Sequence, residues 1–230
     1  MVHEQTVQHL LADADIFEYD LDSELEILTQ LDEFVACDDV VWDVGAHSGL
    51  YGIFISRLYP QIDVYCFEPA ETVLTEYLYN NIDSLSNITV IEKALADTTG
   101  SQQFLQTKNS ATVNALKGEI IHPGDVPDVD SYEQVTVETI TATDAVQNDN
   151  IPIPDFVKID VEGAEHRVLD GFGGVLSDVR TLLIEVHYDD STPQRLDDIR
   201  YRLTNAGFTV TELAHREPRI QQTHLLAERE

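Results

Sequence analysis

The stretch VVWDVGAHSGLYGIFISRL, residues 40–58, decides the fold of this chain. Its first five residues form a short, mostly apolar run, which is typical of a strand covered on both faces. A glycine-containing turn over residues 45–49 follows, and beyond it apolar residues recur at helical spacing until Pro60. The stretch therefore predicts a strand, a tight turn and a helix in direct succession.

The same alternation continues outward along the chain. Further strands are predicted at four apolar runs: residues 62–67, 88–91, 155–161 and 181–187. Helical spacing between and after them predicts the connecting helices, and such strand–helix–strand connections are right-handed crossovers between parallel strands. The segments FTVTEL and THLLA near the end predict an antiparallel hairpin. The fold class is therefore α/β, with a doubly wound, mostly parallel sheet.

Two parts of the chain lie outside this alternation. Residues 1–36 have apolar positions at helical spacing, which predict an N-terminal extension of two amphipathic helices ahead of a main domain over residues 37–230. Within that domain, SQQFLQT and EQVTVETIT have β character and flank a segment containing prolines. Residues 101–140 are therefore predicted to form an antiparallel β insertion with a long loop over 107–132.

The composition is strongly acidic, with 43 Asp and Glu against 13 Lys and Arg and a formal net charge of −30. So few cations cannot easily build the basic face that nucleic acid or an anionic membrane requires. Dense carboxylates predict a halophilic archaeal protein in molar salt, where repulsion is screened within about 3 Å. The chain shows no secretory signal and no long apolar stretch, so a cytoplasmic protein without a transmembrane segment is expected. Cys37 and Cys66 are predicted to be buried thiols.

The turn after the first strand reads Asp43-Val-Gly45-Ala-His47-Ser-Gly49. Its glycines let the backbone approach a ligand, and Glu68 follows at the end of the next strand, where an acid can accept both hydroxyls of an adenosine ribose. A dinucleotide usually needs GxGxxG to hold its pyrophosphate. The spacing here is DxGxxxG, and its leading acid would repel phosphate but attract an amino group. The pattern favours S-adenosylmethionine, with an NAD-dependent oxidoreductase as the alternative.

A second set of charged residues lies near the ends of two later strands. Alternate strand residues share a face, so Lys158, Asp160 and Glu162 are expected to point one way, and Glu185 shares a face with His187. Charged groups on otherwise apolar strands are costly unless they are paired or face a ligand. Ligands bind at the carboxyl ends of such strands, so Asp160 and His187 are predicted site residues. For Lys158, an ion pair with Glu185 between adjacent strands is an equal alternative.

A metal site is the remaining question for these residues. Asp160, Glu165, Glu185 and His187 offer suitable oxygen and nitrogen ligands. No compact motif such as HExxH is present, so the prediction is that no metal is bound. Five other histidines are scattered along the chain and are predicted to lie at the surface: His3, His9, His122, His215 and His224.

The chain resembles the FkbM-type family of S-adenosylmethionine-dependent methyltransferases. The resemblance rests on DVGAHSGLYG (43–52), CFEP (66–69), VIEKALAD (90–97) and above all DFVKIDVEGAEHRVLDGF (155–172). It covers about residues 40–190 and implies the Rossmann-like class I methyltransferase fold, whose seven-stranded sheet has an antiparallel last strand. It also implies the cofactor-binding residues: Asp43, Gly45, Ala46, His47, Gly49, Glu68, Pro69, Ala94 and Asp160.

The implied activity is O-methylation, with Asp160, His187, Lys158 and Glu185 as the predicted catalytic residues. A hydroxyl acceptor must lose a proton, which His187 or Asp160 could take, whereas a carboxyl acceptor needs no base and Lys158 could position it. The expected acceptor is a sugar, a glycan or a small metabolite, selected by the 107–132 loop. A module that binds the cofactor without turnover is a third possibility, and the N-terminal helices could cover the cleft or form a homo-oligomer contact.

Overall fold

The computed structural model describes residues 1–16, 18–107, 115–116, 132–188, 192, 194–215 and 222–229. Its main element is a seven-stranded sheet in the order β10-β11-β9-β8-β1-β2-β3. The strands are β1 (Val40–Val44), β2 (Asp63–Phe67), β3 (Ile88–Ile91), β8 (Phe156–Ile159), β9 (Thr181–His187), β10 (Thr209–His215) and β11 (Gln222–Glu228). Neighbours from β3 to β9 pair in parallel, and β11 lies antiparallel between β9 and β10. The predicted sheet and its antiparallel last strand are confirmed.

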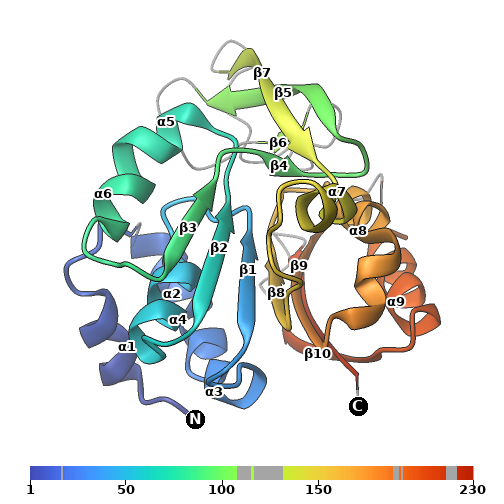
Figure 1. Ribbon diagram of the computed structural model, residues 1–230. Helices are drawn as coiled ribbons and strands as arrows, with labels where there is room; N and C mark the ends of the chain where they lie inside the picture. Colours follow the sequence, from blue (N-terminus) through green and yellow to red (C-terminus); the bar gives the residue numbers. More distant parts are fainter. Residues whose placement is uncertain are drawn as a thin grey trace.

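Helices cover both faces of this sheet (Figure 1). One face carries α1 (Glu4–Leu11), α2 (Glu18–Leu28), α3 (Leu31–Phe34), α4 (Leu50–Leu58) and the consecutive segments α5 (Glu71–Val73), η1 (Leu74–Leu78) and α6 (Tyr79–Ile82). The other carries α7 (Ala142–Gln147), α8 (Glu165–Phe172), η3 (Gly173–Asp178) and α9 (Arg195–Asn205). Val41 and Trp42 are adjacent in β1 yet enter opposite cores. Burial on both faces explains why this strand is apolar at consecutive positions.

A second, four-stranded sheet follows β3 and has the order β4-β7-β5-β6. Its strands are β4 (Ala94–Leu95), β5 (Gly100–Thr107), β6 (Ala115–Leu116) and β7 (Tyr132–Ile140). The long β5–β7 pair is antiparallel, as predicted for the insertion, but β4 precedes residue 101 and pairs with β7 in parallel. Figure 1 shows this sheet beyond the end of the main sheet at which β2 and β3 finish. Residues 108–114 and 117–131 of the predicted long loop, with Asn109, Asn114 and His122, lie outside the described residues.

The N-terminal segment forms three helices where two were predicted. The second predicted helix is divided at residues 29–30, where the Thr29 hydroxyl and the Gln30 amide both donate to the Glu26 carbonyl. These helices share one apolar core with α4. In addition, Arg57 of α4 pairs with Asp13 at 2.5 Å. The segment is therefore packed directly onto one face of the sheet.

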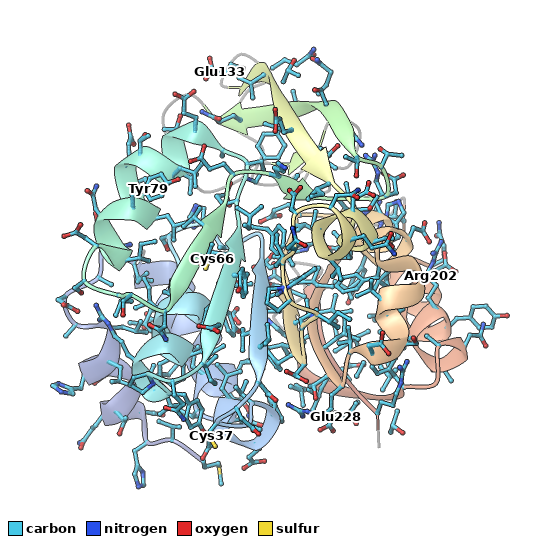
Figure 2. All side chains as sticks on the ribbon, viewed as in Figure 1. Cys37, Cys66, Tyr79, Glu133, Arg202 and Glu228 are labelled. Carbon is cyan, nitrogen blue, oxygen red and sulfur yellow. The ribbon has the colours of Figure 1, made fainter. Side chains whose placement is uncertain are left out.

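Two local predictions are wrong. Strand β8 ends at Ile159, because Glu162 and Gly163 have φ angles of +50° and +99° and form a turn. Glu162 therefore does not share a strand face with Lys158. Cys66 is buried as expected, but Cys37 is exposed; Figure 2 labels Cys66 within the sheet region and Cys37 at the edge of the molecule. Within the described residues, no helix is both long and apolar enough to cross a membrane.

Candidate active site

The loop between β1 and α4 packs against the residue that follows β8. Gly45 and Gly49 have φ angles of +79° and +92°, which side-chain-bearing residues rarely adopt. A Cβ atom on Gly45 would lie 1.8 Å from the carbonyl oxygen of Asp160, so only glycine fits there. The Asp160 N–H in turn donates to the Val44 carbonyl at 2.9 Å. The two sequence motifs are therefore in direct contact.

The first N–H groups of this loop are already used within the protein. Gly45 and Ala46 both donate to the Phe67 carbonyl, at 2.9 and 3.1 Å. The His47 N–H donates to Oε2 of Glu68 at 3.0 Å. A pyrophosphate site needs N–H groups that are directed at the phosphates. These three donors are not available for that purpose, so they cannot form a dinucleotide cradle.

Glu68 is a buried carboxylate at the carboxyl end of β2. Its Oε1 accepts the Ala70 N–H at 2.8 Å, and its Oε2 accepts the His47 N–H. Burial raises the pKa of Glu68. A carboxylate has about four acceptor positions, so each oxygen can take one more donor. Glu68 can therefore accept a pair of neighbouring hydroxyl groups.

Asp43 is a second buried carboxylate, one strand away. Its Oδ2 accepts the Gly52 N–H of α4 at 2.9 Å. Burial raises the pKa of Asp43 to about 6, although the charge of Lys158 on the neighbouring strand opposes the rise. The β1–β2 and β1–β8 registers place the ends of these three strands side by side. The carboxyl edge therefore carries acids from β1 and β2 next to the β8 motif.

Lys158 is almost fully buried and is held within this edge. Its Nζ lies 3.2 Å from Oδ2 of Asp160 and 4.7 Å from the centre of the Tyr51 ring. The ion pair of Lys158 is therefore made with Asp160, and not with Glu185 as the alternative prediction had it. The side chain of Asp160 is 33% exposed, whereas that of Lys158 is 2% exposed. Although burial opposes it, the positive charges of Lys158 and His187 keep the pKa of Asp160 below its ordinary value.

His187 is buried at the end of β9 and is fixed by Glu165 of α8. Its Nδ1 lies 2.7 Å from Oε1 of Glu165, which also accepts the His187 N–H at 3.2 Å and the Gly163 N–H at 3.0 Å. Its Nε2 is 3.8 Å from Oδ1 of Asp160 and 3.6 Å from Oε2 of Glu162. Burial opposes protonation, but Glu162 and Glu165 together raise the pKa of His187 well above its ordinary value. The imidazole therefore favours its charged form beside Asp160.

Glu185 connects this cluster with the N-terminal helices. Burial and the charge of Asp160 raise the pKa of Glu185 well above its ordinary value. Its Oε1 accepts a hydrogen bond from the Gln222 amide. His224 of β11 lies opposite Glu185 of β9 in the sheet. It is 1% exposed, so the prediction that His224 lies at the surface is wrong. His3 and His9 are exposed as predicted; His122 and the His215 side chain lie outside the described part.

Of two further predicted cofactor residues, one lies in the second sheet and the other beside it. Ala94 is in β4, opposite Thr139 of β7. Pro69 lines a groove of about 410 Å³ between α5–η1 and the second sheet. Four carboxylates also line this groove: Glu71, Glu76, Glu133 and Glu138. The groove is therefore polar and acidic, and it begins one residue after Glu68.

Potential metal ligands gather in two groups among the described residues. One group is Asp160, Glu185 and His187, and the other is Glu24, Glu185 and His224; in each, the ligand atoms lie within 4.8 Å of one another. Sequence reasoning considered members of the first group but did not recognise Glu24 or His224. It also weighed Glu165 only as a metal ligand, whereas the structure shows it fixing His187.

The family model of the FkbM methyltransferase domain matches residues 43–210, so the chain belongs to that family. One relative is the hexuronic acid methyltransferase AglP of Haloferax volcanii, 26% identical over 168 residues; the match covers 73% of this chain and 64% of AglP, just under two-thirds of that protein. Another is the 31-O-demethyl-FK506 methyltransferase FkbM of Streptomyces tacrolimicus, 24% identical over 81% of this chain and 78% of the relative.

Solved structures share the fold at low identity. An FkbM methyltransferase from Methylobacillus flagellatus aligns with a TM-score of 0.55 at 16% identity, over 97% of this chain and 58% of the other. Aeropyrum pernix fibrillarin, solved with bound S-adenosylmethionine, aligns with a TM-score of 0.51 at 14% identity, over 88% and 72% of the two chains. These similarities establish the class I methyltransferase fold.

Proposed function

We propose that this chain is an S-adenosylmethionine-dependent methyltransferase that methylates a hydroxyl group of a sugar or another small molecule. The observation that carries the proposal is the meeting of two motifs at one edge of the sheet. Gly45 lies against the backbone of Asp160, so the predicted cofactor loop adjoins the most exposed carboxylate of the polar cluster. Membership of a methyltransferase family supports the reaction class.

The donor set fits S-adenosylmethionine better than NAD. The first N–H groups of the loop are held by Phe67 and Glu68, which argues against a pyrophosphate. Asp43 and Asp160 place negative charge beside the loop, which suits an ammonium and a sulfonium group. Glu68 retains acceptor capacity for a ribose diol. By resemblance, Gly45 to Gly49 would hold the methionine end of the cofactor.

When bound, the cofactor would supply an electrophilic methyl group. The protein's own part is to align the acceptor, exclude water and accept the hydroxyl proton. Asp160 is the candidate base, because its side chain is the most exposed carboxylate of the cluster. His187 is buried and meets Asp160 through Nε2, so it positions that carboxylate and does not itself reach the acceptor. Lys158 has the same supporting role from the other side.

The charge of the cluster favours a hydroxyl over a carboxyl acceptor. A substrate carboxylate would approach Asp160 and Glu162, and the Lys158 ammonium that could attract it is buried against Asp160. The acidic groove that begins at Pro69 would also repel an anionic reacting group. The hexuronic acid named for AglP contains both kinds of oxygen, so this relative is compatible with either position.

Calorimetric titration with S-adenosylmethionine in molar salt tests the cofactor. The wild-type chain should bind one equivalent, and Glu68→Gln should weaken binding about tenfold or more because a charged acceptor is lost. Asp63→Asn, at the exposed beginning of β2, is the matched control and should leave affinity unchanged. Absence of binding by the wild type, or saturable binding of NAD instead, would overturn this assignment.

The acceptor is tested with methyl-labelled donor and three acceptors of one sugar series: a neutral hexoside, the matching uronic acid and its methyl ester. Transfer to a hydroxyl gives an ether, which retains the label in mild alkali. Transfer to a carboxylate gives an ester, which releases it. We expect alkali-stable label that requires Asp160 and is lost in Asp160→Asn. Alkali-labile label on the uronic acid alone would contradict the hydroxyl assignment.

A further inference from the structure

A compact group of buried side chains lies behind the proposed active site. It consists of Glu24 from α2, Glu185 from β9 and His224 from β11, and their exposed fractions are 5%, 3% and 1%. Each of the three offers one ligand atom, and these atoms all lie within 4.8 Å of one another. They come from parts of the chain that are far apart in sequence, so the tertiary fold itself assembles the group.

The separations suit a shared cation. Nε2 of His224 lies 3.0 Å from Oε2 of Glu24 and 3.8 Å from Oε2 of Glu185. Metal–ligand bonds of about 2.0–2.2 Å in tetrahedral geometry place ligand atoms about 3.3–3.6 Å apart. The observed distances lie on either side of that range. The ligand atoms of Glu24 and Glu185 lie within 4.8 Å of each other, so side-chain rotations would bring the three atoms to one ion.

The surroundings hold these ligands in place. The Gln222 amide donates to Oε1 of Glu185, and the Glu185 side chain also shares a hydrogen bond with Asp160. The Tyr51 hydroxyl donates to Oε2 of Glu24. Neighbours of this kind orient metal ligands in known sites.

We propose that Glu24, Glu185 and His224 bind one divalent first-row transition ion, zinc or manganese. Mixed imidazole and carboxylate ligands favour such ions over calcium or magnesium. The other group, around Asp160 and His187, is a poorer site because the Lys158 ammonium lies 3.2 Å from Asp160 and would repel a cation. The ion would tie α2 to the centre of the sheet. The sequence predicted that no metal is bound and placed His224 at the surface. The proposed site differs from that prediction because His224 is buried next to two carboxylates.

The test uses the full chain in molar salt, stripped with a chelator and titrated with zinc chloride or manganese chloride. The wild type should bind one ion per chain. Glu24→Gln and His224→Gln should each lower the affinity about 100-fold or more, beyond the loss typical of a supporting neighbour. The matched control, His187→Gln, removes the histidine of the other group and should change it less than about threefold. Circular dichroism would establish that each variant is folded.

The wild type alone gives a second test if a variant fails to fold. X-ray absorption of the zinc-loaded chain should show one imidazole nitrogen and otherwise light oxygen ligands. The proposal is overturned by three results: no ion binds, no imidazole is coordinated, or binding is lost in His187→Gln but kept in Glu24→Gln. None of these readouts depends on methyl transfer, so the proposal stands or falls separately from the proposed function.

Discussion

Replacing Asp43 with Asn should make the protein more stable and the proposed cofactor site weaker. Burial raises the pKa of Asp43 from 3.8 to about 6, so ionisation costs about 3 kcal/mol more in the folded than in the unfolded chain. The folded chain therefore keeps this proton at pH values where the unfolded chain has lost it, and stability from this group falls as pH rises from 3.8 to 6. Asparagine carries no such penalty, and its carbonyl oxygen can still accept the Gly52 N–H.

Urea unfolding of both proteins in molar salt between pH 5 and pH 8 measures this effect. The variant should gain about 2 kcal/mol at pH 5 and about 3 kcal/mol at pH 7, with no further gain at higher pH. These values already include the attraction between Asp43 and Lys158, which opposes the rise of the pKa. The exposed Asp63→Asn change should show no such pH dependence. A difference that does not vary with pH, or a variant that is less stable throughout, would refute the reasoning, and unchanged S-adenosylmethionine affinity would remove Asp43 from the cofactor site.

Three further predictions concern two glycine contacts and the Glu165–His187 pair. Gly45→Ala should destabilise the chain by about 2–4 kcal/mol in urea unfolding, because the new Cβ would meet the Asp160 carbonyl at 1.8 Å; near-wild-type stability would mean that the contact relaxes easily. Gly171→Ala should destabilise the chain by a similar amount, because the new Cβ would lie 2.0 Å from the Ala96 carbonyl oxygen. Calorimetry on the folded fraction should show that cofactor affinity changes by less than about twofold. Glu165→Gln should lower kcat about tenfold while donor affinity is retained, because His187 loses its charged partner; an equal loss of both would indicate a general structural role.

The fold could be predicted from sequence because its strands are apolar at consecutive positions. Val41 and Trp42 enter opposite cores, and no solvated strand would carry that pattern. The boundary of β8 was misplaced because alternation continues through Val161, and the turn depends on the left-handed conformation of Glu162. Propensity alone does not anticipate that conformation in a glutamate.

The candidate site was predicted only in part. Asp43, Glu68, Asp160 and His187 stand at strand ends, so topology alone brings them to one edge. Glu24 and His224 could not be found in this way, because a glutamate in an amphipathic helix and a histidine in a final hairpin are typical surface residues. Their burial depends on which elements pack together: α2 against the sheet, and β11 between two other strands. That information is tertiary and is not contained in local spacing.

The position of β11 also bears on how the chain matures during synthesis. This strand follows every other strand of the sheet in sequence, yet it pairs with β9 and β10 and supplies Gln222 and His224 to the interior. The β1–β9 portion of a nascent chain leaves the ribosome before β11, because synthesis proceeds from the N-terminus. Until β11 is inserted, Glu185 lacks these two neighbours. The buried polar cluster around Glu185 would therefore be completed last. Before that, β9 would be an unpaired edge strand that exposes Glu185.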